Sequence, residues 1–250
     1  MDALEKALYD YHNTTKTIVE ILNETGLSKS YFYRHLDYKE DFRAKKKARK
    51  YTFNFDKFQN LSRATCYWLG FLSADGAVVK NTLAIELKEI DKEHLEKFNK
   101  YFNNEAPINI RVNNNGVSCA KTQINSFELV EFLKNFNIVQ NKSKIFTMPL
   151  NKIPSEYHLD FARGMIDGDG CIRINNHQQI SLEFCSGNKE CVEQMKQILH
   201  LENKITQDKN TFHVQVTGNK KAKAILDTLY ENSTYDTRLN RKYNIYKTLN

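Results

Sequence analysis

Two aspartates stand at the same place in two similar stretches of this sequence. Asp75 precedes the last glycine of YWLGFLSADG (residues 67–76), and Asp169 precedes the last glycine of FARGMIDGDG (residues 161–170). If each stretch ends a helix, each carboxylate faces the negative end of a helix dipole, and a second carboxylate nearby adds repulsion. A divalent cation between them would offset this cost, and carboxylate oxygens suit Mg²⁺ or Mn²⁺. The pattern therefore predicts that Asp75 and Asp169 bind a divalent metal.

Small residues in both stretches predict how the two aspartates are brought together. Gly70 and Ala74 are four residues apart in the first stretch, as are Gly164 and Gly168 in the second. Small residues at this spacing lie on one face of a helix and allow two helices to approach backbone to backbone. The final glycine of each stretch is expected to end its helix. We therefore expect two helices that pack together and end side by side.

The sequence after each stretch repeats one order of elements, which alternating and helical apolar patterns predict. In the first copy the predicted strand, helix, strand and helix lie at 83–88, 91–101, 117–124 and 126–136. In the second copy they lie at 180–185, 189–199, 212–216 and 219–230. Each half is interpreted as helix, two strands, helix, two strands, helix. The prediction is an α+β domain over residues 51–250, with pseudo-symmetric halves at about 60–150 and about 154–250.

Residues 1–50 are predicted to be a separate small all-α unit with a basic linker. Ile18, Ile21 and Leu22 have helical spacing, Gly26 breaks the pattern, and Ser28 can cap a second helix. This arrangement resembles a helix-turn-helix, whose second helix enters the DNA major groove. The residues that it would present to DNA are Lys29, Ser30, Tyr33 and Arg34. The alternative is a helical hairpin that only packs on its neighbour.

The charge and cysteine content narrow the class of protein. A net charge of +7 favours a polyanionic partner, and a basic run lies at residues 43–50. That run is either a solvated linker or a strap on phosphates. The five cysteines contain no C-x-x-C pair, so neither a zinc site nor a disulfide framework is expected. No apolar stretch is long enough for a membrane span and no signal peptide is evident, so we expect an intracellular protein.

The two stretches and their repeated surroundings, over about residues 60–250, resemble the LAGLIDADG homing endonucleases. The resemblance implies that the two motif helices form the interface between the halves and that the sheets straddle the DNA major groove. It also implies that Asp75 and Asp169 hold the metal and an attacking water at the scissile phosphates. Two motifs in one chain imply a monomer. Ser73 replaces the earlier aspartate of the motif, Asp167 retains it, and this position is expected to brace the helix.

The resemblance further implies basic and base-reading side chains. Lys121 occupies the strand position of a basic catalytic residue, although it could equally be a solvent-facing lysine. Its counterpart in the second half stays open among the neighbours of Val214 and the C-terminal basic residues. The residues expected to contact DNA on the sheets and at the C-terminus are Lys80, Glu86, Lys88, Arg173, Asn175, Gln178, Ser181, Glu183, Arg241 and Lys242.

The function that these features predict is site-specific cleavage of both strands of a long asymmetric DNA target, with a divalent metal. One alternative is a DNA-binding regulator that uses the same scaffold without cutting, although the retention of both aspartates argues against it. Another is an intron maturase, which would bind structured RNA through the same basic surfaces.

Overall fold

The computed structural model describes residues 1–14, 16–36, 50–113 and 115–248. It divides into two compact units, Met1–Lys50 and Tyr51–Asn250, which are described separately. Apart from Lys50, the predicted basic run lies outside the described residues. Among the described residues, no helix combines the length and apolar character needed to cross a membrane.

The first unit contains three helices, α1 (Ala3–Asn13), α2 (Ile18–Thr25) and α3 (Lys29–His35). Side-chain caps from Asp2, Thr17 and Ser28 begin them, and Gly26 ends α2 in the left-handed region with φ 68°. The two helices and the glycine turn lie where the sequence predicts them, whereas α1 was not predicted. The buried core of this unit consists of Ala7, Tyr11, Ile21, Phe32 and Leu36.

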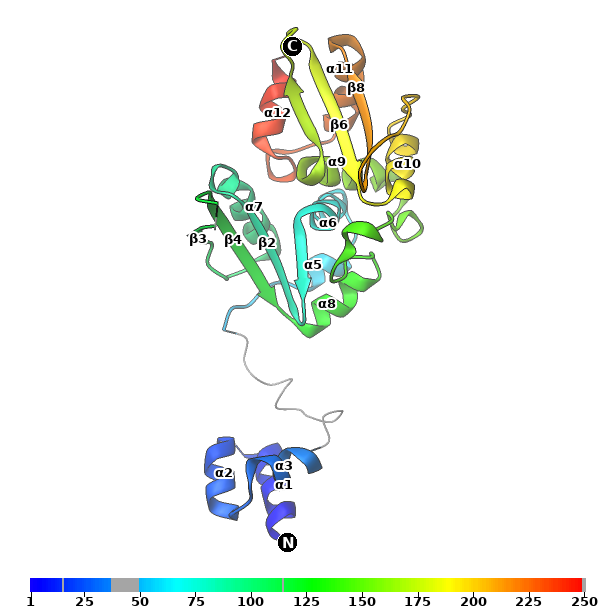
Figure 1. The fold of residues 1–250 in the computed structure, drawn as a ribbon. Helices are drawn as coiled ribbons and strands as arrows, with labels where there is room; N and C mark the ends of the chain where they lie inside the picture. The colour runs from blue at the N-terminus through cyan, green and yellow to red at the C-terminus, as the bar shows by residue number, and fades with distance from the viewer. Residues whose placement is uncertain (15, 37–49, 114, 249–250) are drawn as a thin grey trace. The chain divides into compact units, whose positions relative to one another are not determined.

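The second unit begins with α5 (Asp56–Gln59) and then repeats one order of elements twice (Figure 1). The first half contains α6 (Arg63–Asp75), β1 (Gly76–Val79), β2 (Thr82–Lys88), α7 (Lys92–Phe102), β3 (Asn109–Val112), β4 (Ser118–Asn125) and α8 (Phe127–Lys134). The second half contains α9 (His158–Asp169), β5 (Cys171–Ile174), β6 (Ile180–Ser186), α10 (Lys189–Ile198), β7 (Thr206–Asp208), β8 (Thr211–Thr217) and α11 (Asn219–Tyr230). Helix α12 (Asn240–Lys247) follows. Short 3₁₀ turns are η1 (Glu89–Asp91), η2 (Lys142–Lys144), η3 (Leu150–Lys152), η4 (Ser155–Tyr157) and η5 (Tyr235–Thr237).

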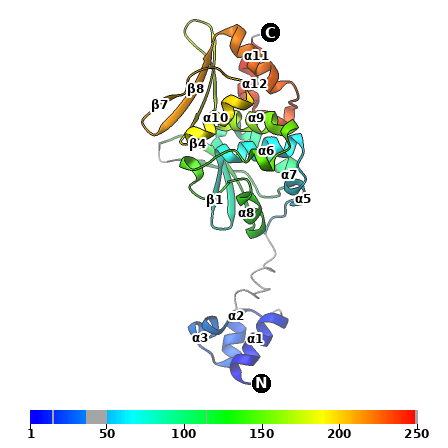
Figure 2. The ribbon, with the colours of Figure 1, turned by 90° about the vertical axis from the view of Figure 1, so that its right-hand side faces the viewer.

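Each half contains an antiparallel four-stranded sheet, and the orders β1-β2-β4-β3 and β5-β6-β8-β7 are equivalent. This confirms the predicted pair of αββαββα halves. One face of each sheet is apolar because side chains alternate along a strand. Residues buried on these faces include Leu83, Ile85, Ala120 and Ile124 in the first half and Ile172, Leu182, Phe184 and Val214 in the second. Helices α7, α11 and α12 lie on one side of the strands, so the other sheet faces are left open (Figure 2).

Helices α6 and α9 meet backbone to backbone at their small residues. A Cβ atom on Gly70 would lie 2.0 Å from the carbonyl oxygen of Phe161, and one on Gly164 would lie 2.0 Å from that of Tyr67. Further along the pair, a Cβ atom on Gly168 would lie 2.3 Å from the Ala74 Cβ. Real Cβ atoms do not come this close, so glycine is required at these crossings. The spacing of small residues therefore predicted the contact correctly.

The glycines that follow the two helices act differently from the left-handed stop that is common at helix ends. Gly76 has φ −72° and Gly170 has φ −77°, which any residue can adopt. Glycine is needed there because a Cβ atom would lie 2.4 Å from the Leu72 oxygen or 2.6 Å from the Ile166 oxygen. At both places the chain turns from the helix into a strand, and a backbone carbonyl of the last helical turn packs against the glycine.

We predict that Gly164→Ala lowers the free energy of unfolding by at least about 3 kcal/mol, because the added methyl group meets backbone atoms that cannot rotate away. Gly116→Ala is the matched control, since its Cβ would have no neighbour within 4 Å and only the φ of 75° opposes it. That control should cost about 1 kcal/mol. Urea unfolding followed by the fluorescence of Trp68, the single tryptophan, measures both. Equal losses would contradict the backbone contact.

Candidate active site

The two motif aspartates are the last residues of α6 and α9. Asp75 is half-buried, and the side chain of Asp169 reaches the surface. A Cβ atom on Gly168 would lie 3.2 Å from Oδ2 of Asp75, so the Asp75 carboxylate rests against the backbone beside Asp169. The close helix pair therefore places two carboxylates from different halves at one end of the interface.

Both carboxylates hold their protons more tightly than free aspartates do. Burial, and next the charge of Asp169, raise the pKa of Asp75 from its ordinary 3.8 to about 7. Desolvation by the surrounding protein also raises the pKa of Asp169, although the side chain is open to solvent on one side. A raised pKa means that Asp75 stabilises the folded chain while it is protonated. This contribution is complete below the ordinary pKa and is lost as the pH rises through about 7.

Lys142 places a cation at the end of α6. It is buried, and its Nζ donates to the carbonyl oxygens of Ala74, at 3.3 Å, and Gly76. Burial lowers the pKa of Lys142, while Asp169 and Asp75 oppose that change. The lysine comes from the turn after the last helix of its half, far from the motif in sequence.

Lys242 does the same at the end of α9. Its buried Nζ donates to the carbonyl oxygens of Ile166 (2.7 Å), Asp167 (2.8 Å), Gly168 (3.2 Å) and Gly170. Burial lowers the pKa of this lysine too, and the charge of Asp167 opposes it. Carbonyls at a helix end lack partners within the helix, so each lysine satisfies these groups and offsets the negative end of a helix dipole.

The chemistry of the donors fits a hard divalent cation. Asp75 and Asp169 offer carboxylate oxygens, and Lys142 and Lys242 stand behind them as fixed positive charges. Among the described residues, no group of three or more His, Cys, Asp and Glu side chains could hold a metal. Two carboxylates with open positions for water and phosphate oxygens are typical of Mg²⁺ rather than of zinc.

Lys121 lies on β4 and is half-buried, opposite Glu86 of β2. Its counterpart in the second half is His213. Both residues precede the cap of the following helix by five positions, since the caps are Ser126 and Gly218. The sequence left this counterpart open, because counting back five positions from Asn219 reaches the apolar Val214, whose neighbour is His213.

Val214 is buried in the core. His213 lies on the other face, where its Nδ1 is 3.0 Å from Oε1 of Glu183. The cations that lower the pKa of Asp75 are Lys242 and Lys142. Lys142 is therefore a site residue that the sequence reasoning missed. Matching the segments that follow α8 and α11 could have found it, because each contains a lysine, Lys142 in the first and Lys242, within α12, in the second.

The earlier aspartate position of the motif, occupied by Asp167 in the second half and by Ser73 in the first, braces a helix end only where the aspartate is present. Asp167 is buried and accepts hydrogen bonds from the hydroxyls of Tyr67 (2.9 Å) and Tyr230 (3.2 Å) and from the backbone N–H of Leu239 (2.8 Å). Ser73 donates only within its own helix, to the Leu69 oxygen at 2.8 Å. The helix end in the second half is thus tied to three other segments, as a bracing role requires.

Several residues predicted to read DNA lie on the open sheet faces. Glu86 pairs with Arg111, and Glu183 lies 3.5 Å from Arg173. Lys88 is exposed at the end of β2. These side chains share the solvent side of their sheets, as the strand alternation predicts.

Others of the predicted set are located differently. Lys80 and Gln178 lie in hairpin turns with positive φ, and the Asn175 side chain caps the second of these turns by accepting from the N–H groups of His177 and Gln179. Ser181 is buried, with its hydroxyl accepting from Gln215 at 2.7 Å.

Two predicted residues at the C-terminus are engaged by the protein itself. Arg241 makes a paired ion contact with Asp91, with distances from 2.9 to 3.2 Å, and Lys242 is buried as described. In the first unit, Lys29, Ser30 and Arg34 are exposed on α3, whereas Tyr33 is half-buried and packs against the core.

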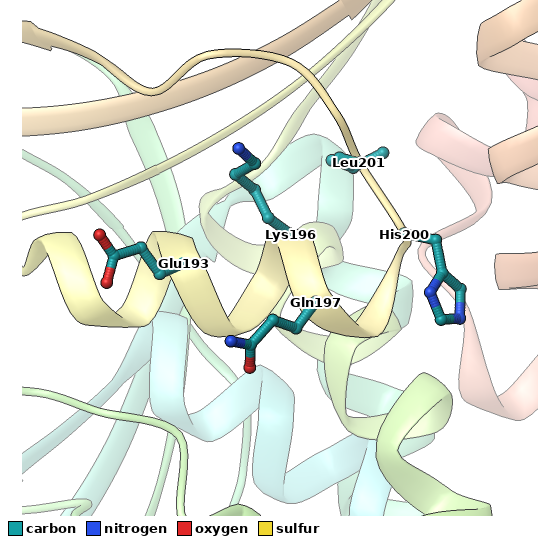
Figure 3. Close-up of a pocket in the computed structure, with 5 residues that line it drawn as sticks. All are labelled: Glu193, Lys196, Gln197, His200 and Leu201. Carbon is teal, nitrogen blue, oxygen red and sulfur yellow. The ribbon is translucent and has the colours of Figure 1, made fainter.

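A shallow surface hollow lies along α10 and the turn after it (Figure 3). Its lining residues are Glu193, Lys196, Gln197, His200 and Leu201. They come from one helix and its end, and none of them belongs to the carboxylate site.

Comparison with known proteins gives a family match in the second half. Residues 156–230 match the family model of a LAGLIDADG-like domain. The chain is similar in structure to the LAGLIDADG homing endonuclease I-LtrWI bound to its target DNA, with 16% identity, a TM-score of 0.51, and coverage of 76% of this chain and 90% of that one. It is also similar to the LAGLIDADG homing endonuclease I-GzeII in complex with a DNA target, with 12% identity, a TM-score of 0.51, and coverage of 76% and 89%. No curated protein sequence matches the chain.

Proposed function

We propose that this protein is a site-specific DNA endonuclease, because residues 156–230 match the LAGLIDADG-like domain family and the two halves have the fold of LAGLIDADG homing endonucleases. The observation that carries the proposal is the pair of carboxylates Asp75 and Asp169. The contact between α6 and α9 places both at the same end of the helix interface, and both have raised pKa values. A protein that only binds DNA gains nothing from two carboxylates in such an unfavourable arrangement. The reaction is hydrolysis of one phosphodiester in each strand, with Mg²⁺ or Mn²⁺ as cofactor.

In this proposal Asp75 and Asp169 hold the divalent cation and orient the groups around it. A cation held by these two carboxylates would supply a water of lowered pKa and positive charge to stabilise the phosphate during in-line displacement. Lys142 and Lys242 keep the helix ends in place and add positive charge where the phosphates approach. Asp167 keeps α9 in register with the C-terminal segment and does not bind the cation. Lys121 and His213 lie further out, on the open sheet faces, where they contact the substrate.

The open faces of the two sheets form the DNA surface in this proposal. They carry Lys88, Arg111, Lys121 and Arg173, which match phosphates and the acceptor groups of guanine. The pseudo-twofold repeat fits a single chain that addresses the two strands of a long asymmetric site. The first unit extends the contact through Lys29, Ser30 and Arg34 on α3.

We predict that the wild-type protein linearises a plasmid carrying its target in Mg²⁺ and not in EDTA, and that Asp75→Asn and Asp169→Asn each lower cleavage at least about a thousandfold. The target is selected beforehand from a randomised DNA library by binding. Both variants should retain the same DNA affinity within about threefold, because the metal ligands contribute little to groove contacts. Binding without cleavage by the wild type would favour the regulator, and preferential binding of structured RNA would favour the maturase.

For the first unit, we predict that Lys29→Ala combined with Arg34→Ala weakens DNA binding and reduces the salt dependence of log K by about two, one for each lost phosphate contact. The control is Lys6→Ala combined with Lys16→Ala, which removes the same charge from α1 and from the segment between α1 and α2. Binding isotherms at several salt concentrations measure the slopes. Identical slopes for both double variants would show that α3 does not contact DNA.

A further inference from the structure

The two segments that follow the last helix of each half both reach the opposite half. The C-terminal segment (residues 231–247) leaves α11 of the second half and contacts α7 and η1 of the first. Arg241 pairs with Asp91, Nδ2 of Asn240 donates to Glu93 at 3.0 Å, and Nζ of Lys97 donates to the Arg238 oxygen at 3.2 Å. These contacts join positions far apart in sequence.

The linker segment (residues 138–154) leaves α8 of the first half and contacts α10 of the second. Gln194 binds both backbone groups of Met148: its Oε1 accepts from the N–H at 2.7 Å, and its Nε2 donates to the carbonyl at 3.0 Å. At the same crossing, a Cβ atom on Gly187 would lie 2.6 Å from the Ser143 oxygen. The linker segment and the C-terminal segment therefore cross the interface in opposite directions.

Each crossing segment also carries one of the two site lysines. Lys142 stands beside Ser143, and its Nζ returns to the end of α6 in its own half. Lys242 stands beside Arg241, and its Nζ returns to the end of α9 in its own half. Each lysine is thus held between the motif helix of its own half and an anchor on the other half.

We propose that Asp91 and Gln194 are positioning residues, each of which places the site lysine that belongs to the opposite half. Asp91 of the first half fixes Lys242 through Arg241, and Gln194 of the second half fixes Lys142 through Met148. Neither half then completes its own site alone. The proposal rests on the proposed endonuclease function.

The contact between Asp91 and Arg241 is expected to hold its lysine more firmly than the contact between Gln194 and Met148. Asp91 is only 8% exposed, and the guanidinium of Arg241 contacts both of its oxygens, a geometry that fixes orientation as well as distance. Removing the charge of Asp91 leaves Arg241 without its two-point partner, so the backbone before Lys242 is released. Removing the Gln194 amide frees two backbone groups of Met148, which lies further from Lys142 along the chain.

Because one pseudo-twofold relates both the halves and the two DNA strands, each lysine faces one strand. We therefore expect Asp91→Asn and Gln194→Ala to slow the cutting of different strands, each by about tenfold, a size typical of second-layer contacts to a metal site. The substrate is a linear DNA that carries the selected target, with a different label on each strand. The rate at which each labelled strand is cut is then measured separately, and nicking of a supercoiled plasmid with the same target gives a second measure of single-strand cutting. DNA affinity should stay within about twofold.

The matched controls are Glu96→Gln on α7 and Glu193→Gln on α10. Glu96 lies on the helix that follows Asp91, and Glu193 lies on the helix that contains Gln194. Each variant removes an exposed carboxylate that pairs with a lysine of its own helix, Lys92 or Lys189. They should leave both strand rates unchanged. Equal slowing of both strands by Asp91→Asn and by Gln194→Ala, or no slowing by either, would overturn the proposal. A wild-type protein that cuts neither strand would instead overturn the proposed function, and the inference with it.

Hydrogen exchange in the full chain without DNA tests the anchors independently of activity. Asp91→Asn is expected to speed amide exchange at residues 239–247 and to leave residues 142–148 as in the wild type. Gln194→Ala is expected to do the reverse. Exchange that is unchanged in both segments, or raised equally in both, would contradict the crossed arrangement.

Discussion

The structure depends on the backbone contact between α6 and α9. Gly70 and Gly164 remove the side chains that would keep the helices apart, and the two helices then end at one point. This closeness brings Asp75 and Asp169 to one end of the interface, where burial raises the pKa of both and the charge of Asp169 raises that of Asp75 further. The same contact that builds the interior of the domain therefore creates the charge problem that a bound cation would resolve.

Lys142 and Lys242 show how the protein tolerates this arrangement. A buried ammonium is costly unless its protons have acceptors, and the unpaired carbonyls of a helix end provide them. Each lysine thereby stabilises a helix end, and its charge lowers the pKa of Asp75 and Asp169 against the effect of burial. Since both lysines are carried by segments that cross between the halves, the site, the helix interface and the association of the halves form one connected structure.

The sequence predicted the repeated helices and strands well, but it did not predict contacts between side chains and backbone groups that are far apart in sequence. Small residues four positions apart identified the α6–α9 contact, and period-two strands identified both sheets, because these signals are local. Lys142 was missed because its own segment does not indicate that the side chain returns to Gly76, and only a comparison with the segment that contains Lys242 points to it. His213 was left unassigned because the count began at Asn219, the first helical residue, rather than at the cap Gly218. Gly76 acts through a close carbonyl rather than a positive φ, which spacing does not reveal.

Mn²⁺ binding to the 250-residue chain tests the central claim most directly, with the signal of free Mn²⁺ in electron paramagnetic resonance as the readout. The wild type is expected to bind more tightly as the pH rises from about 6 to about 8, because a proton on Asp75, with its pKa of about 7, competes with the cation. Asp75→Asn and Asp169→Asn should each weaken binding at least about tenfold. Equal Mn²⁺ affinity in the wild type and both variants would contradict a metal site built by the paired helices.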